Sequence, residues 1–255
     1  MERRKFVKST LAASAVPMSV ASISAGSDRA WADDRELYEI RTYDMKFGGN
    51  GKLLISYLKD ALKPALMRVG VNHLMLFEEL GNSDPKQLRV LISYPNAVTY
   101  LNAQNLGGDV SFNSAAAEYT GVGPDKPLFN RFSSSLLLAF EGLPQMMSPV
   151  DGATLFELRT YEGYSEDAVR RKIKMFNKEE IPLFLNVGLH PVFFGEMISG
   201  PYRPCLTYML HFKDMEEHDA NWQKFITSPV WDAMKVKEEY ANTVSNIRKT
   251  FLKPM

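Results

Sequence analysis

Apolar and polar positions follow one series of patterns through the first half of the chain. Residues 37–43 alternate along a stretch rich in β-formers, which predicts a strand, and residues 51–67 carry leucine and isoleucine at helical spacing, which predicts a helix. Two apolar runs, residues 71–80 and 88–94, flank a spacer of turn-forming residues and predict a hairpin. A second helical region and a strand at residues 131–140 follow, so the predicted order is βαββαβ, the ferredoxin-like plan.

The same series recurs in the second half. Its predicted elements are a strand at 155–161, a helix at 166–186, strands at 189–198 and 205–212, helices at 215–225 and 230–239, and a strand at 244–252. The sequence itself also repeats, because YEIRTY at residues 38–43 returns as FELRTY at residues 156–161, an offset of 118 (156 − 38). Further on, Glu118-Tyr119 matches Glu239-Tyr240 at an offset of 121, which indicates a three-residue insertion in the second copy. The chain is therefore predicted to be an internal duplication.

The duplication predicts how the two copies associate. A four-stranded sheet with helices on one face leaves its other face apolar and uncovered. Two such modules in one chain can cover each other sheet against sheet, which gives a closed or nearly closed barrel with the helices outside. We expect one module at residues 33–141 and another at 153–255, joined by a linker at 142–152 that contains Pro144 and Pro149.

The first 32 residues are predicted to be an export signal and not part of the folded domain. Arg3 and Arg4 precede a weakly apolar stretch at residues 11–23, and Ala30-Trp31-Ala32 supplies a small-x-small cleavage pattern. This segment resembles a twin-arginine signal peptide, which would place the protein in the periplasm or outside the cell. The alternative interpretation is a disordered basic N-terminus.

Composition narrows the choice of partners. Thirty basic and thirty acidic residues give a formal net charge of zero, which disfavours a nucleic-acid partner. No segment is apolar for long enough to predict a transmembrane helix. The only cysteine, Cys205, excludes an intrachain disulfide and lies in an apolar predicted strand, where we expect it to be a small core residue.

The two hexapeptides, together with Trp222 and the SPVW segment at residues 228–231, carry a resemblance to the NIPSNAP family. That resemblance covers essentially the whole chain after the N-terminal segment. It implies an α+β fold in which the two ferredoxin-like βαββαβ modules form an intramolecular dimeric α/β-barrel. It leaves the activity open, because this fold also hosts monooxygenases, isomerases and haem proteins. The first copy departs from the family pattern, since residues 101–119 contain no tryptophan.

The opening strand of each copy holds the best candidates for a site. Strand period places three polar side chains of each hexapeptide on one face, Glu39, Arg41 and Tyr43 in the first copy and Glu157, Arg159 and Tyr161 in the second. The apolar set is expected to face the helices, so by elimination this polar set is expected to face the barrel interior. One interpretation is structural, with each Glu and Arg paired along the strand. The other is functional, with the Arg and Tyr side chains holding a ligand in a partly apolar cavity.

The histidines and the known motifs add little chemistry. His73 and His211 lie in predicted strands and are candidates to bind haem iron if they face the interior, whereas hydrogen bonding within the strands is the simpler interpretation. His218 is expected on a solvent-facing helix. No histidine pair has the spacing of a helical metal site, and no phosphate-binding or hydrolase motif occurs, so no protein-ligated metal is predicted. No cofactor is predicted, and haem and flavin stay open as alternatives.

Three functions from different classes are consistent with this sequence. The first is the binding of a small, partly apolar ligand in the barrel between the two modules. The second is an oxygenase or isomerase activity in the same cavity, and the third is a non-catalytic interaction protein whose barrel is only a packed core. A homo-oligomer is compatible with each of them.

Overall fold

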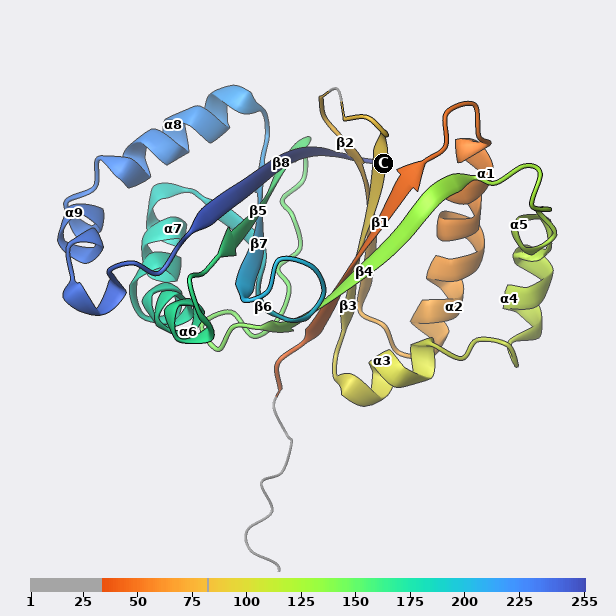
Figure 1. Cartoon of the computed structure of the whole chain (residues 1–255), viewed down its shortest axis with the longest axis horizontal. Coiled ribbons are helices and arrows are strands. Elements are labelled where there is room, and N and C mark those ends of the chain that lie inside the picture. Colours follow the sequence, from red (N-terminus) through yellow and green to blue (C-terminus); the bar gives the residue numbers. More distant parts are fainter. Residues whose placement is uncertain (1–33, 82) are drawn as a thin grey trace, which may run out of the picture. The chain divides into compact units, whose positions relative to one another are not determined.

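The computed structural model describes residues 34–81 and 83–255, and residues 34–255 form one compact unit (Figure 1). The predicted signal peptide, residues 1–32, lies outside the described residues. The strands occupy the middle of this unit, and helices of each half flank them on either side. None of the helices in the described ranges has both the length and the hydropathy of a membrane span.

The elements occur in the predicted order in both halves. The first half consists of β1 (Leu37–Met45), α1 (Gly51–Ser56), the π-helix η1 (Tyr57–Leu62), α2 (Lys63–Arg68), β2 (His73–Glu79), β3 (Gln87–Tyr94), α3 (Ala97–Ala103), α4 (Val110–Ala115), α5 (Ala117–Thr120) and β4 (Phe129–Ala139). The second half consists of β5 (Leu155–Glu162), α6 (Glu166–Met175), the π-helix η2 (Phe176–Glu180), α7 (Ile181–Val187), β6 (His190–Ser199), β7 (Cys205–Phe212), α8 (Met215–Ile226), α9 (Pro229–Lys235), the 3-10 helix η3 (Glu238–Tyr240) and β8 (Asn246–Pro254).

Each first helix widens into a π-helical turn at the same place, just before a proline. Pro64 is the second residue of α2, and Pro182 is the second residue of α7. A proline inside a helix has no N–H, and its ring clashes with the carbonyl four residues earlier, which here belongs to Asp60 or Lys178. Both of those residues lie in the π-helical turn, which accommodates the proline without ending the helix.

The strands form a closed barrel in the order β1-β3-β2-β8-β5-β7-β6-β4. Two seams join the halves. At the first, β2 pairs with β8 through Phe77, Glu78 and Glu79, and at the second, β4 pairs with β6 between residues 136 and 139. The predicted α+β fold of two ferredoxin-like modules closed into a dimeric α/β-barrel is thereby confirmed.

Three apolar clusters show which strand faces point inward. One cluster packs the helices of the first half on the outer face of their sheet, and a second cluster does the same in the second half. The third cluster fills the barrel and mixes residues of both halves, among them Tyr38, Ile40, Phe156, Leu158 and Met209.

The expected orientation of the hexapeptide strands is therefore wrong. Leu37 and Tyr43 of β1 pack against helix residues such as Leu54, whereas Tyr38 and Ile40 belong to the barrel interior. The set of Glu39, Arg41 and Tyr43 thus faces the helices, and the equivalent set on β5 does the same. Both faces of these strands carry aromatic and apolar residues, so strand alternation alone could not decide between them.

The linker lies across one end of the barrel and is bound there by hydrogen bonds. The carboxylate of Glu36 accepts from the backbone N–H of Met146 at 2.7 Å, and the Met147 N–H donates to the Val192 carbonyl at 2.9 Å. The Val150 N–H donates to Nε2 of His211 at 3.1 Å. We refer to this as the linker end, and to the opposite end, where β1 and β5 finish, as the mouth.

Candidate functional site

A cavity of about 720 Å³ opens at the mouth between strands of both halves. Its lining includes hydroxyl groups and arginines around an apolar floor of Ile40, Leu158 and Met197. The lining hydroxyl residues and arginines are Thr42, Arg89, Ser133, Ser135, Thr160, Tyr202, Thr207, Arg248 and Thr250.

Strand register explains why these polar groups converge. On the first half, Thr42 of β1 pairs with Arg89 of β3 on one side and with Ser133 of β4 on the other. On the second half, Thr160 of β5 pairs with Thr207 of β7 and with Arg248 of β8. Paired residues point to the same face of a sheet, and Thr42 and Thr160 alternate with the outward-facing arginines of their strands. Each half therefore presents a threonine flanked by one arginine to the mouth.

Arg89 is positioned by neighbours on three strands. Its Nη1 donates to Oγ1 of Thr42 at 3.3 Å, and its Nη2 donates to Gln87 at 2.7 Å and to the Glu79 carboxylate at 3.3 Å. The remaining Nε–H is buried and has no hydrogen-bond partner among the described residues. An unpaired buried donor costs roughly 1–3 kcal/mol, so this guanidinium is short of one acceptor.

Arg248 approaches the mouth from the opposite side of β2. Its Nε donates to the carboxylate of Glu162 at 2.5 Å, and its guanidinium carbon lies 3.9 Å from the centroid of the Tyr202 ring. Its Nη groups make no hydrogen bond to a described residue. The mouth thus offers one cationic wall, formed by β3 and β8, and a facing wall of hydroxyl groups from β4 and β7.

Glu39 and Arg41 of the first hexapeptide form a hydrogen-bonded polar network between the sheet and the helices. Arg41 donates from Nε and Nη2 to the two oxygens of Glu39, at 2.8 and 2.9 Å, and the hydroxyls of Tyr94 and Ser134 also donate to Glu39 at 2.7 Å each. Burial alone would raise the pKa of Glu39, but the hydrogen bonds and charge of Arg41, with those two hydroxyls, hold it below its ordinary value. This carboxylate is therefore ionised and fully paired.

The second half builds the same pair with different neighbours. Arg159 donates to Glu157 at 2.8 Å, and the indole N–H of Trp222 donates to the other carboxylate oxygen at 2.9 Å. The guanidinium carbon of Arg159 lies 3.8 Å from the centroid of the Trp222 ring, a cation–π contact. The Tyr161 and Tyr208 hydroxyls are 2.8 Å apart.

One helical histidine lies elsewhere than predicted. His218 is buried, and its Nε2 lies 3.3 Å from Glu157 Oε2, at an angle that makes no hydrogen bond. The expectation of a solvent-facing His218 is therefore wrong. Its ring packs against those of Phe212 and Phe251, with centroids 4.9 and 5.2 Å away, which places it on the inner side of α8.

The predicted site residues thus assemble within each half but do not form one site between the halves. The two Glu-Arg-Tyr sets lie between sheet and helices, and none of their residues lines the mouth cavity. His211 faces the interior near the linker end, where burial lowers its pKa to about 4 and its Nε2 is already used by the linker. His73 pairs with Ser93 near the same end. No group of three potential metal ligands occurs in the described part of the chain.

Sequence reasoning missed the residues of the mouth. Thr42 and Thr160 belong to the duplicated hexapeptides, in the positions between the charged residues. Reversing the assignment of the two strand faces would have found them. Arg89 and Arg248 carried no such signal, because neither has an arginine at the equivalent position of the other half.

Comparison with known proteins agrees with this architecture. Residues 156–255 match the sequence profile of the NIPSNAP family. A candidate monooxygenase from Fusobacterium nucleatum superposes with a TM-score of 0.58 at 9% identity, covering 86% of this chain and 92% of that one. A candidate monooxygenase from Lactobacillus acidophilus superposes with a TM-score of 0.57 at 11% identity, covering 86% and 94%.

A shorter relative covers one half. An uncharacterized NIPSNAP-like domain protein from Burkholderia xenovorans is 18% identical over 41% of this chain and 87% of its own, with a TM-score of 0.37. No curated protein matches the chain. The chain therefore carries a NIPSNAP domain in its second half, within a barrel that has the fold of the dimeric α/β-barrel proteins.

Proposed function

We propose that the protein binds a small, partly apolar molecule in the mouth of the barrel, with an acceptor group of the ligand held by Arg89 and Arg248. The observation that carries this proposal is that two arginines, Arg89 and Arg248, line one cavity together with hydroxyl and apolar groups. A carboxylate or a similar oxygen group could accept from the guanidinium of Arg89 and from the Nη groups of Arg248, which donate to no described residue.

The rest of the cavity suits the other end of such a molecule. Ile40, Leu158 and Met197 give it an apolar floor, and the hydroxyls of Thr160 and Thr207, which lie 2.8 Å apart, can orient a polar substituent. The volume of about 720 Å³ lies within the range of small-molecule sites.

The proposed function is binding, without a chemical step. Identities of 9% and 11% to the two candidate monooxygenases support the fold alone and give no reason to transfer their chemistry. The Glu-Arg pairs, which are the most conspicuous charged groups in the sequence, are engaged with each other away from the cavity.

Titration with 8-anilinonaphthalene-1-sulfonate, an apolar organic anion whose fluorescence rises on binding, tests the site. We expect saturable binding, weakened about tenfold by Arg89→Met and by Arg248→Met, because a charged hydrogen bond contributes roughly 1.5–3 kcal/mol. Native mass spectrometry of protein purified from its source would add the mass of a retained ligand. Arg170→Met is the control, since that arginine is 68% exposed on α6 and does not line the mouth.

Equal affinity for the dye in all three variants would contradict the proposal. A loss of affinity caused by unfolding would be recognised from the thermal melt. Because Arg89 contacts Glu79 and Gln87, Arg89→Lys serves as a second variant that keeps the charge. We expect it to fold normally and still to bind more weakly, since an ammonium group cannot reproduce the planar fork of a guanidinium.

A further inference from the structure

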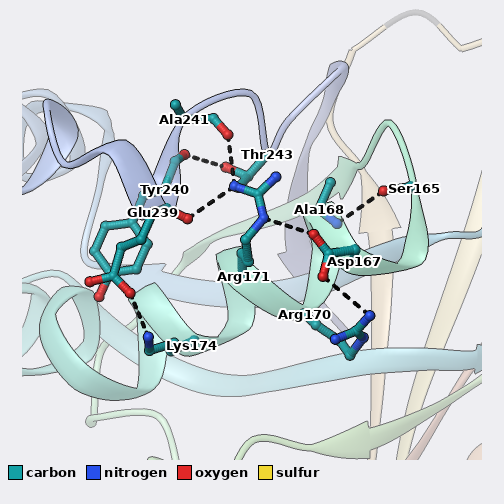
Figure 2. A network of polar contacts seen from close by, with 10 residues as sticks. All are labelled: Ser165, Asp167, Ala168, Arg170, Arg171, Lys174, Glu239, Tyr240, Ala241 and Thr243. Atoms are coloured by element: carbon teal, nitrogen blue, oxygen red, sulfur yellow. Dashed lines mark hydrogen bonds and ion pairs between the residues drawn. The ribbon is translucent and has the colours of Figure 1, made fainter.

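The two halves differ where the helix after the first strand begins. In the second half an arginine joins this end of the helix to the segment before the last strand, as Figure 2 shows. Arg171 of α6 donates from Nη1 to the carbonyls of Glu239 and Ala241, at 3.0 and 2.8 Å, and from Nε to the carboxylate of Asp167 at 2.9 Å. These contacts tie α6 to the segment that precedes β8.

The first half lacks this closure. At the offset of 118, the counterparts of Asp167 and Arg171 are Gly49 (167 − 118) and Leu53 (171 − 118), which carry neither a carboxylate nor a guanidinium. Helix α1 also begins late, since Gly51 corresponds to residue 169 whereas α6 begins at Glu166. A loop at residues 46–50 replaces the missing turn, and Gly48 at φ +71° gives it a backbone conformation that other residues rarely adopt.

The facing segment of the first half is longer. Tyr119 and Tyr240 correspond at an offset of 121 (240 − 119), but barrel register equates Ser133 with Arg248, an offset of 115 (248 − 133). The first half therefore has six additional residues between Tyr119 and Ser133 (133 − 119 = 14) compared with Tyr240 and Arg248 (248 − 240 = 8). The predicted insertion in the second copy is thus followed by a larger insertion in the first.

These two differences leave a cavity of about 590 Å³ between residues 46–50 and 121–128. Leu53 lines it, as do Lys46 from one loop and Lys126 from the other. Neither lysine forms an ion pair within residues 34–81 and 83–255. Gly48, Gly49, Gly121 and Gly123 also line it. The N–H groups of Gly49 and Gly121 donate to the Lys46 and Ala117 carbonyls, whereas those of Gly48 and Gly123 have no acceptor within the described residues.

We propose that this cavity is a second ligand site, separate from the mouth, that takes a small molecule bearing a phosphate-type oxyanion. Two ammonium groups from facing loops, unpaired with any carboxylate, are suited to such a group, because lysine binds phosphate as a point charge. The backbone N–H groups of Gly48 and Gly123 can add two donors in the same cavity. Asp125 also lines the cavity, and its carboxylate would repel an anion. Replacing Asp125 should therefore strengthen binding, whereas replacing either lysine should weaken it.

Calorimetric titration of the folded protein with inorganic pyrophosphate at low ionic strength tests this site. We expect one binding event, weakened about fivefold by each of Lys46→Met and Lys126→Met, the effect of removing one solvent-exposed charge contact. Asp125→Asn should tighten binding about twofold, since it removes a like charge from the lining. Lys213→Met is the matched control, because this exposed lysine lies in the second half beyond β7.

Three outcomes would overturn the proposal. The first is the absence of pyrophosphate binding, and the second is binding that neither lysine variant weakens. The third is binding that Arg89→Met and Arg248→Met abolish while the lysine variants keep it, which would assign the oxyanion to the mouth. Both lysines are exposed, so their replacement should change stability by less than about 0.5 kcal/mol and leave the folded protein available for every titration.

Discussion

Glu39 and Arg41 are more deeply buried than charged residues usually are, with side chains 4% and 12% exposed. A buried pair of this kind gains from mutual attraction and from the hydrogen bonds of its neighbours, and it loses the hydration of both ions. Removing one partner alone should therefore cost far more stability than replacing both partners with apolar residues. Glu157 and Arg159 repeat the arrangement with side chains 0% and 14% exposed.

Replacing Arg41 or Arg159 with Met should lower the free energy of unfolding by roughly 3–5 kcal/mol, because each change leaves a buried carboxylate without its counter-ion. Urea unfolding followed by circular dichroism would measure this loss. The exposed Arg170→Met should change stability by less than about 0.5 kcal/mol.

The double variant Glu39→Leu with Arg41→Met sharpens this prediction. It should regain most of the stability lost in Arg41→Met, with a residual cost because the Tyr94 and Ser134 hydroxyls lose their acceptor. A cost below about 1 kcal/mol for the single arginine variants would show that these pairs are well hydrated and not a structural feature of the core.

At the scale of the element, the linker has a structural role that its sequence did not show. Pro and Gly residues between the copies predicted a connection, and nothing in that composition indicated that Met146 would be buried in the barrel cluster. The fixed position depends on partners far apart along the chain, Glu36 and His211. Contacts of this kind follow from the closed barrel and carry no local signal.

The contact between the linker and His211 predicts a pH dependence. Burial, followed by the charge of His190, lowers the pKa of folded His211 from 6.5 to about 4. Between these values the unfolded chain binds a proton that the folded protein does not, so stability contributed by neutral His211 is fully present above pH 6.5 and is lost as pH falls towards 4.

We expect the free energy of unfolding, measured at intervals from pH 7 to 4, to fall less steeply in His211→Gln than in the unchanged protein. The difference in slope should approach one proton at most, and the glutamine oxygen can still accept from the Val150 N–H. The ionisable neighbours of His211 are His190, whose ring stacks on it, and Glu217, which lies 3.9 Å from His190, so His190→Gln is the control for their contribution. Identical slopes in all three proteins would refute the assignment.

Element prediction succeeded where local pattern and tertiary burial agree. Strands β1 and β5 and the helices after them follow directly from period and from the repeat. The assignment of strand faces failed because both faces of β1 carry apolar or aromatic residues. Leu37 and Tyr43 pack against the helices, Tyr38 and Ile40 pack in the barrel, and only the assembled barrel decides which face is which. The same ambiguity hid Thr42 and Thr160, whereas Arg89, Arg248 and the serines of the mouth belong to no motif.

At the scale of the whole molecule, each half depends on the other to cover the inner face of its sheet. The interior cluster takes residues from both halves, including Phe77 and Phe156, whose ring centroids are 4.9 Å apart. A half expressed alone would expose that apolar face to water, and large exposed apolar patches favour association.

Residues 33–145 expressed alone should therefore dimerise or aggregate, whereas residues 33–255 should give the barrel from one chain. Size-exclusion chromatography with light scattering distinguishes these cases. A soluble, monomeric and cooperatively folded half would contradict the role assigned to the shared interior. Export by the twin-arginine route stays a separate prediction about residues 1–32.

The covalent joining of the two halves has a consequence for how a ligand can be oriented. In a barrel made from two identical chains, every group around the axis occurs twice, and a molecule bound on that axis meets the same surroundings in two opposite poses. Here Arg89 stands opposite Thr207, and Arg248 stands opposite Ser133, so the twofold equivalence is broken at the entrance. The two opposite poses of an unsymmetrical molecule in the mouth would therefore meet different groups, a difference that a barrel of two identical chains could not provide.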